Sequence, residues 1–293
     1  MSINQLKHLY ISPLEQCNLN CKICYTQKTK AVLSNEEILD FIKRYQKIQK
    51  LESVTFCGGE VFLLKDFSQL INELTDRDIF IQIISNGTID RLNEIEQANM
   101  VNLIISLDGL EDYHDLNRGI GNFAKSIELL KKAIKLGFHT EIFSIVTKEN
   151  LQSIPQFEKE IEQQLGKKIE ITYHPRKPIA YLKNHPISNV LGQVENFNFL
   201  EPKEVQQLME QKQTFPPKNL GCYQISLISD KKVYACCEGI HPIGDIDTDV
   251  EVLIKNLQKR LENCNGKQCR QGCLDCVEPD FVCGFKDIFS KIK

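Results

Sequence analysis

The sequence of 293 residues has no tryptophan, no strong excess of either charge and no long apolar run. No stretch approaches the roughly 20 apolar residues that a membrane-spanning helix needs, so we expect no membrane segment. A formal net charge of −3 gives no basic surface of the kind that binds nucleic acid. Residues 1–7 contain no charged segment that leads into an apolar stretch, so no signal peptide is expected. These absences predict a cytoplasmic protein.

Cysteine is missing from residues 58–221, although the chain has twelve cysteines in all. Three lie within residues 17–24, one is Cys57, and eight lie within residues 222–283. Cytoplasmic thiols normally stay reduced, so a disulfide framework is not expected. A packing role would scatter cysteines along the chain, so the clustering favours metal binding or catalysis. Cys57 stands alone and is interpreted as a small buried hydrophobic residue.

The first 175 residues alternate between short apolar runs and amphipathic stretches. Six strands are predicted, at residues 8–11, 54–56, 79–84, 101–107, 142–146 and 169–173. Helices are predicted at residues 34–50, 66–75, 88–97, 122–136 and 150–165. Strands that alternate with helices predict a parallel sheet with right-handed crossovers. The sheet is either an open doubly wound sheet or a partial barrel.

Beyond about residue 175 the alternation ends. We interpret the proline-punctuated stretch that follows as a connector with a short helix near residues 202–212. The cysteine-rich tail carries a predicted hairpin around residues 230–232 and a helix near residues 248–262. Two domains are therefore predicted. They are a barrel domain of residues 1–200, with its core at 7–175 and its connector at 176–200, and a cysteine-rich domain of residues 201–293.

Candidate functional residues come after four of the predicted strands. They are the cysteines of residues 17–24, Gly58–Glu60, Ser85–Gly87 and Asp108–Gly109. The carboxyl ends of parallel strands meet at one edge of the sheet, where α/β folds bind their ligands. One such segment could be an ordinary turn, whereas four at the same edge favour a single site.

Cys17, Cys21 and Cys24 are close enough in sequence for one loop to wrap a compact metal centre. Structural zinc takes four protein ligands, usually as two separated pairs. Three cysteines on a [4Fe–4S] cluster would leave one iron open, which suggests catalysis. The alternatives are a zinc knuckle that borrows His8 or a distant cysteine, and three unrelated core thiols.

With these motifs, residues 7–175 resemble the radical S-adenosylmethionine (SAM) superfamily, whose signature is Cys-x3-Cys-x2-Cys after the first strand of a partial (β/α)6 barrel. The matching positions are Cys17, Cys21 and Cys24, then Tyr25 as the aromatic residue, Gly58-Gly59-Glu60, Ser85-Asn86-Gly87, and Ser106-Leu107-Asp108-Gly109 with His114, Asp115 and Arg118. The last segment is similar to the sulfatase-maturase and peptide-modifying branch. The resemblance implies an α/β fold, a partial TIM-like barrel with a small cysteine-rich carboxy-terminal domain.

The resemblance also implies the chemistry. S-adenosylmethionine would bind the open iron and be cleaved reductively to a 5′-deoxyadenosyl radical, which abstracts hydrogen from a substrate. An electron donor such as flavodoxin or ferredoxin would supply the electron. Gly58 and Gly59 would let the backbone approach the methionine moiety, Glu60 would hold its ammonium group and Arg118 its carboxylate. The remaining cofactor-binding residues would be Tyr25, Ser85, Asn86, Ser106 and Asp108. The alternative for these positions is an ordinary turn, a local cap or a solvated side chain.

The eight cysteines of the tail resemble the auxiliary iron–sulfur extension called SPASM, or Twitch in its shorter form. They are Cys222, Cys236, Cys237, Cys264, Cys269, Cys273, Cys276 and Cys283. Residues 243–246 resemble another segment of this extension. The spacing from Cys264 to Cys283 departs from the usual run, so the resemblance implies one or two auxiliary [4Fe–4S] clusters without assigning ligands to each. A zinc ribbon built from the cysteines at 264, 269, 273 and 276 is the alternative.

Glu238 follows Cys237, where sulfatase-maturing relatives carry a proton acceptor. The resemblance therefore makes Glu238 the candidate base, and the alternative is a surface glutamate.

The sequence as a whole predicts a radical enzyme that oxidises or crosslinks a peptide or protein. Because Cys17 lies close to the start, a separate peptide-recognition protein, or the substrate itself, would have to provide recognition. Two alternatives stay open. One is radical dehydrogenation of a small alcohol or sugar, and the other is a non-enzymatic iron–sulfur electron carrier or zinc-stabilised interaction module.

Overall fold

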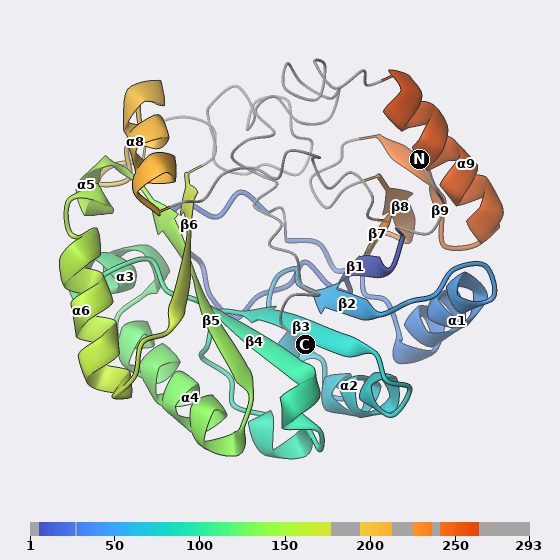
Figure 1. Cartoon of the computed structure of the whole chain (residues 1–293), viewed down its shortest axis with the longest axis horizontal. Coiled ribbons are helices and arrows are strands. Elements are labelled where there is room, and N and C mark those ends of the chain that lie inside the picture. Colours follow the sequence, from blue (N-terminus) through green and yellow to red (C-terminus); the bar gives the residue numbers. More distant parts are fainter. Residues whose placement is uncertain (1–5, 27, 177–193, 213–224, 236–240, 264–293) are drawn as a thin grey trace.

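The computed structural model describes residues 6–26, 28–176, 194–212, 225–235 and 241–263. Within these residues, nine strands form one sheet in the order β6-β5-β4-β3-β2-β1-β7-β8-β9. The sheet curls around an interior, and helices lie on its outer side (Figure 1). β6 and β9 are the two edges of the sheet and are not paired with each other in the part that the structure describes, so the barrel is partial.

The first six strands are parallel, and each is hydrogen-bonded to the next along the chain. They are β1 (His8–Ser12), β2 (Ser53–Phe56), β3 (Phe80–Ser85), β4 (Val101–Ser106), β5 (His139–Val146) and β6 (Glu170–Pro175). The helices that connect and follow them are α1 (Asn35–Gln46), α2 (Phe67–Thr75), α3 (Glu111–Arg118), α4 (Asn122–Leu136), α5 (Lys148–Leu151), α6 (Ile154–Leu165) and α8 (Pro202–Lys212). The predicted parallel α/β fold is confirmed. No helix among the described residues has the length and apolarity to cross a membrane.

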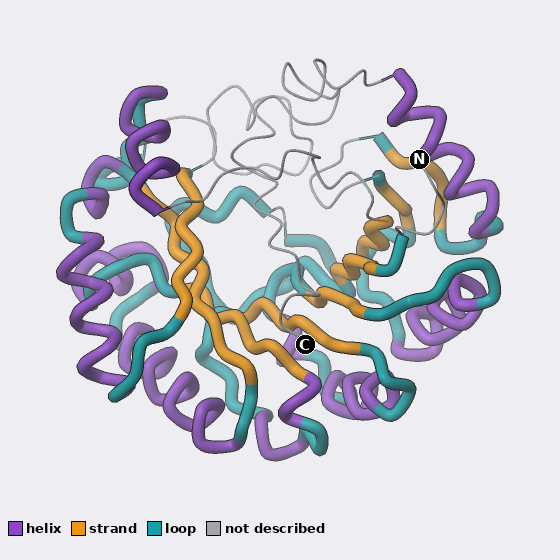
Figure 2. The backbone as a smooth tube through the Cα atoms, viewed as in Figure 1, coloured by secondary structure: helices purple, strands orange, loops and turns teal. Residues whose placement is uncertain are grey.

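Alternate residues of the strands face the helices and form the hydrophobic core. Leu9 and Ile11 of β1 have no exposed surface, and neither do Phe41 and Tyr45 of α1. These side chains belong to one continuous apolar cluster. Figure 2 shows the same arrangement along the chain, with the strands inside and the helices outside. The outer face of the sheet is therefore apolar and buried beneath the helices, as expected for strands covered by crossover helices.

The residues between these positions point into the barrel interior and include several polar side chains. His8 Nδ1 lies 2.7 Å from Ser53 Oγ, and its Nε2 lies 3.2 Å from Thr55 Oγ1. Further along the sheet, Asn102 Nδ2 donates to the Glu141 carboxylate at 3.1 Å. The interior thus carries hydrogen-bonding groups on several strands.

Burial makes His8 a source of pH-dependent stability. It lowers the pKa of His8 to about 3, so the ring is neutral in the folded chain. An unfolded histidine has a pKa of about 6.5 and takes up a proton below that pH, whereas the buried ring stays neutral. The contribution of His8 to the free energy of unfolding is therefore full above pH 6.5 and is lost as the pH falls toward 3. We expect His8 to account for a loss of about 2 kcal/mol of unfolding free energy between pH 7 and pH 5. Urea unfolding of the wild-type chain and His8→Gln at both pH values measures this, and an equal pH dependence in the two chains would contradict it.

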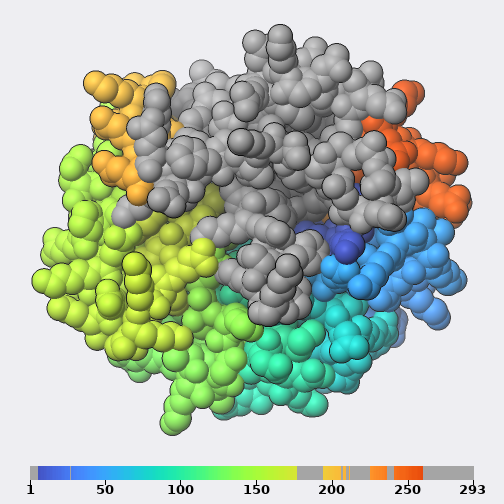
Figure 3. All heavy atoms as spheres, viewed as in Figure 1, coloured from blue at the N-terminus to red at the C-terminus, as the bar shows by residue number. Residues whose placement is uncertain are grey.

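The sheet continues past β1 with strands from the tail of the sequence. β7 (Ile225–Ile228) pairs in parallel with β1, and β8 (Lys232–Tyr234) and β9 (Pro242–Asp245) follow in antiparallel order. The predicted hairpin and the predicted last helix, here α9 (Val250–Asn263), are both present. Arg44 of α1 donates to the carbonyl of Ile246, and Lys231 forms an ion pair with Glu37. In the space-filling view, α9 (red) accordingly lies beside the blue α1 region (Figure 3).

Three helical segments differ from prediction. The helix predicted at 88–97 is wrong, because that stretch contains the short 3₁₀ turn Leu92–Glu94 and another, Ala98–Met100, follows. The helix predicted at 150–165 is divided into α5 and α6, since α6 begins anew with a proline in its first turn. α3 was not predicted.

Candidate functional site

The three cysteines lie in the loop that leaves β1 at its carboxyl end. Cys17, Cys21 and Cys24 are half-buried free thiols. The Cys24 amide donates to the Cys21 carbonyl at 3.2 Å, which closes a turn between these two residues. Burial raises the pKa of Cys21 to about 11, although the nearby Arg118 guanidinium opposes the shift. Metal binding at this loop must therefore displace thiol protons.

The segment after β2 packs directly against this loop. The Gly59 amide donates to the Leu14 carbonyl at 2.9 Å, and the Glu60 amide donates to the Gln16 carbonyl at 2.8 Å. A Cβ atom at Gly59 would lie 1.8 Å from the Gln16 carbonyl oxygen, and one at Gly58 would lie 2.2 Å from that of Leu14. The two glycines are required for the close approach of the two loops. Their contact with a methionine moiety stays a prediction.

A side chain at Gly59 should therefore displace the cysteine loop. Because the clash is with backbone, we expect Gly59→Ala to lower the free energy of unfolding by about 3 kcal/mol and to reduce bound iron. Gly121→Ala is the matched control, since a Cβ there meets nothing within 4 Å, although the φ of 79° is unfavourable. We expect Gly121→Ala to lower the free energy of unfolding by only about 1 kcal/mol and to retain its bound iron. Thermal unfolding and iron content check both variants, and a stable, iron-replete Gly59→Ala chain would refute the steric argument.

Glu60 is fully buried and joins the ends of β2 and β3. Its carboxylate accepts hydrogen bonds from the Asn86 amide at 2.8 Å, from Ser85 Oγ at 3.0 Å and from the Phe62 amide at 3.2 Å. Burial raises the pKa of Glu60 above its usual value. The structure thus gives this carboxylate several donors from its own chain, and its predicted contact with an ammonium group is untested.

Asn86 connects β3 to the cysteine loop. Its Nδ2 donates to Asn18 Oδ1 at 2.9 Å and lies 3.6 Å from Cys17 Sγ. Its Oδ1 accepts from the Thr88 amide at 3.0 Å. The predicted cofactor-binding residue Asn86 is therefore brought to the first cysteine, with its amide aimed at the sulfur.

Asp108 and Arg118 form a buried ion pair behind the loop. Arg118 Nε lies 2.6 Å from Asp108 Oδ2, and Nη2 lies 2.9 Å from Oδ1. Burial opposes ionisation of Asp108, but the guanidinium overcomes this effect and holds the pKa of the carboxyl below its usual value. Arg118 Nη1 has no hydrogen bond to any residue that the structure describes. The guanidinium thus binds Asp108 on one side and retains donors for a second carboxylate.

The other residues of the fourth-strand motif are also placed. Ser106 ends β4 and is half-buried, as is Tyr25 in the cysteine loop. His114 Nδ1 accepts from the Asp108 amide at 3.2 Å. The Asp115 carboxylate accepts from the Phe123 amide at 2.8 Å, at the start of α4. His114 and Asp115 therefore fix the loops around the site.

Asn117, which precedes Arg118, was not predicted and contacts both the cysteine loop and Asp108. Its polar helix carries no apolar periodicity that would have revealed it.

Several predicted residues lie outside the described residues. They are Cys222, Cys236, Cys237, Glu238, Cys264, Cys269, Cys273, Cys276 and Cys283. The auxiliary ligands and the candidate base therefore stay predictions.

Three half-buried thiols lie on this one loop, and the thiolates of an iron–sulfur cluster each bind a different iron, so the donor set fits a [4Fe–4S] cluster. His8 does not serve as a fourth ligand, because both of its ring nitrogens lie at hydroxyl groups near the start of β1, whereas the loop follows its end.

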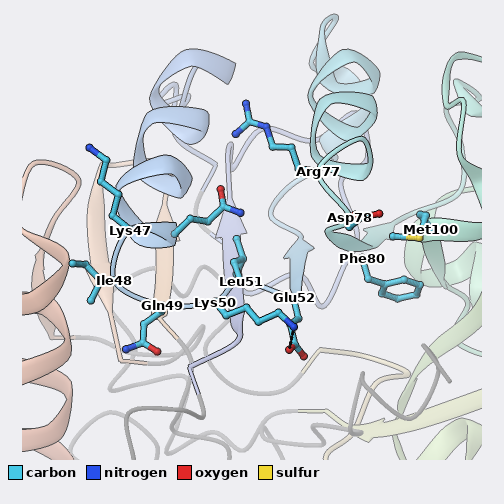
Figure 4. Close-up of a pocket in the computed structure, with 11 residues that line it drawn as sticks. Lys47, Ile48, Gln49, Lys50, Leu51, Glu52, Arg77, Asp78, Phe80 and Met100 are labelled. Atoms are coloured by element: carbon cyan, nitrogen blue, oxygen red, sulfur yellow. Dashed lines mark ion pairs between the residues drawn. The ribbon is translucent and has the colours of Figure 1, made fainter.

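A hollow of about 920 Å³ lies at the opposite ends of the strands. Figure 4 shows Lys47 at the end of α1, Lys50 shortly before β2, and Arg77 and Asp78 just before β3. These residues precede their strands, whereas the cysteine loop and the glycine pair follow theirs. The hollow is therefore separate from the candidate site.

The structure is a partial parallel barrel with polar and cysteine-bearing loops at the carboxyl ends of its strands, the edge at which enzymes of the barrel class carry their active sites. The family model described as "Radical SAM superfamily" matches residues 11–161, just over half of the chain. The chain therefore belongs to the radical SAM superfamily. Membership implies S-adenosylmethionine and a [4Fe–4S] cluster as its cofactors.

Individual relatives differ in their chemistry. The chain is 23% identical to GTP 3′,8-cyclase of Aquifex aeolicus over 79% of this chain and 82% of that protein. It is 27% identical to the sporulation killing factor maturation protein SkfB of Bacillus subtilis, over 47% of this chain but only 35% of SkfB. Among solved structures, anSMEcpe with bound AdoMet has a TM-score of 0.71 at 18% identity and covers 97% of this chain and 96% of its own. Another structure of anSMEcpe, which holds a Cp18Cys peptide as well, has a TM-score of 0.66 at 19% identity and covers 92% and 87%.

Proposed function

We propose that the chain is a radical SAM enzyme that oxidises or crosslinks a peptide or protein after hydrogen abstraction. The observation that carries the proposal is the cysteine loop, held at the carboxyl edge of the barrel between Asn86 and the Asp108–Arg118 pair. SkfB is named as a maturation protein, and a structure of anSMEcpe holds a peptide, which supports a peptide substrate.

Cys17, Cys21 and Cys24 are the proposed ligands of the radical cluster. When bound, the cluster would supply the electron that cleaves S-adenosylmethionine. Arg118 would offer its remaining donors to the methionine carboxylate, and Ser106 and Tyr25 lie at the same edge. The role of the protein is to orient the cofactor and to exclude water from the reaction.

We further propose that the tail binds one or two auxiliary clusters. Ser226 of β7 pairs with Tyr234 of β8, so the start of β7 and the end of β8 lie side by side at the open end of the hairpin. Cys222 lies three residues before Ile225, and Cys236 lies two residues after Tyr234. The two cysteines thus flank the hairpin in sequence, which supports the proposal that they share a site. Glu238 would then be the proton acceptor beside it.

The proposal is tested by anaerobic reconstitution with iron, sulfide, dithionite and S-adenosylmethionine. We expect 5′-deoxyadenosine, and about eight irons per chain with one auxiliary cluster or about twelve with two. About four irons with one zinc would indicate the zinc ribbon instead. Absence of 5′-deoxyadenosine from an iron-replete sample would refute the enzyme proposal.

The role of Glu238 is tested with a peptide encoded beside the gene as substrate. Glu238→Gln should still cleave the cofactor but should form no modified peptide, whereas an unchanged amount of modified peptide would show that Glu238 is not the base.

A small-molecule substrate is the second candidate, because the match to GTP 3′,8-cyclase covers most of the chain. Mass spectrometry of reactions with nucleotides, alcohols or sugars separates the two. A modified metabolite, with neighbouring peptides unchanged, would favour this candidate.

A further inference from the structure

Asn117 lies in the last turn of α3 and is only 2% exposed. Carbonyls in the last turn of a helix lack a partner within the helix. The carbonyl of Asn117 instead accepts a hydrogen bond from the Lys22 amide at 3.0 Å, and its Oδ1 accepts another from the Ile23 amide at 3.3 Å. Both amides belong to the segment between Cys21 and Cys24. One residue therefore holds this segment at two points.

The other end of the side chain is fixed by the buried ion pair. Asn117 Nδ2 donates to Asp108 Oδ2 at 2.7 Å, and the same oxygen accepts from Arg118 Nε at 2.6 Å. Because Nδ2 must face the carboxylate, the amide has one orientation, with Oδ1 toward the loop. An aspartate here would set two carboxylates against each other, and an apolar residue would leave the Ile23 amide without its acceptor. Asparagine matches both partners.

We propose that Asn117 is a positioning residue that preorganises the segment between Cys21 and Cys24 for the iron–sulfur cluster and couples it to the Asp108–Arg118 pair. The inference rests on the proposed role of the three cysteines as cluster ligands. Asn117 acts through backbone amides. Asn117→Ala removes the side-chain hydrogen bond to the Ile23 amide, whereas the main-chain bond to the Lys22 amide stays. Without the side-chain bond, the bound cluster would have to order more of the loop, at a cost in conformational entropy. The cluster should then be released more readily.

Asn117→Ala tests the inference against Asn72→Ala. Asn72 also bridges two loop groups, donating to the Glu94 carbonyl at 2.9 Å and accepting from the Glu96 amide at 3.0 Å, far from the cysteines in sequence. Reconstituted proteins are treated with the iron chelator bathophenanthroline disulfonate, and iron release is followed by absorbance. Subtracting the release from a Cys17→Ala/Cys21→Ala/Cys24→Ala chain isolates the cluster of the loop. We expect Asn117→Ala to release this iron about tenfold faster, and Asn72→Ala at the wild-type rate.

The outcomes separate the inference from the proposed function. Release at the wild-type rate by Asn117→Ala would overturn the positioning role, even with the cluster present. If the triple cysteine variant instead held as much iron as the wild type, the proposed ligands themselves would be wrong.

Hydrogen exchange of the wild-type chain tests the contacts without a substitution that impairs folding. In the iron-free protein, the Lys22 and Ile23 amides should exchange at least about tenfold more slowly than in an unfolded peptide. Exchange at the unfolded rate would also overturn the inference.

Discussion

Replacing any one of Cys17, Cys21 and Cys24 with alanine should abolish formation of 5′-deoxyadenosine. Each thiolate is the proposed ligand of a different iron, and the loop offers no spare cysteine, since the next one along the chain is Cys57 after β2. Loss of one ligand should also lower bound iron by about four atoms per chain, because the whole cluster is lost. Product is measured by liquid chromatography, and iron by a colorimetric assay, on the same anaerobic sample.

Cys57→Ala is the matched control for these variants. Cys57 follows β2 next to Gly58, on the same edge of the sheet. The sequence predicts a small buried hydrophobic residue at this position, whereas the structure shows a half-buried thiol. It should retain both product and iron. Full activity in any of the three loop variants would reject the ligand assignment for that cysteine.

The second large effect is expected from Asp108→Asn. Asp108 is fully buried, and Arg118, Asn117 and the Ile145 amide all donate to its carboxylate. An asparagine would leave the buried guanidinium without a counter-charge and turn one NH2 group toward these donors. Breaking a buried ion pair from one side costs about 3–5 kcal/mol, so unfolding should occur at much lower urea concentration.

Two further variants identify the cause. Asp108→Asn combined with Arg118→Met removes both charges and should recover most of the lost stability, but not the binding of S-adenosylmethionine. Asp90→Asn breaks an exposed pair with Lys132 and should cost no more than about 1 kcal/mol. Urea unfolding gives the stabilities, and calorimetric titration gives cofactor binding. If the double variant were as unstable as Asp108→Asn, the loss of stability would have to come from the changed shape of the side chain rather than from the unpaired charge.

The sequence predicted the strands well because each contains a short run rich in apolar and β-branched residues, and several of these runs are nearly continuous. It failed at residues 88–97, where Ile89, Leu92 and Ile95 are spaced by three, a spacing that suits 3₁₀ turns better than an α-helix. It also missed α3, whose sequence is largely polar. Its two buried positions are filled by polar residues that contact the site, His114 and Asn117.

At the site, the spacing of the cysteines and the motifs after each strand predicted which segments meet. The hydrogen-bond partners of individual side chains could not be predicted from the sequence, because they depend on contacts between segments that are distant along the chain. Glu60 was predicted to bind an ammonium group, yet its oxygens accept from Ser85, Asn86 and Phe62. Arg118 was predicted to hold the methionine carboxylate, and the structure adds that two of its nitrogens already bind Asp108.

The parallel pairing of β7 with β1 bears on how the protein is dissected for experiments. Leu9–Ser12 lie inside the sheet only because Ile225–Ile228 cover them. A recombinant fragment ending near residue 200 would expose β1 as a bare edge, whose unpaired amides and carbonyls favour aggregation. The cysteine loop starts from that strand, so such a fragment would be a poor starting material for reconstitution, and the tail is best kept even when only the first cluster is under study.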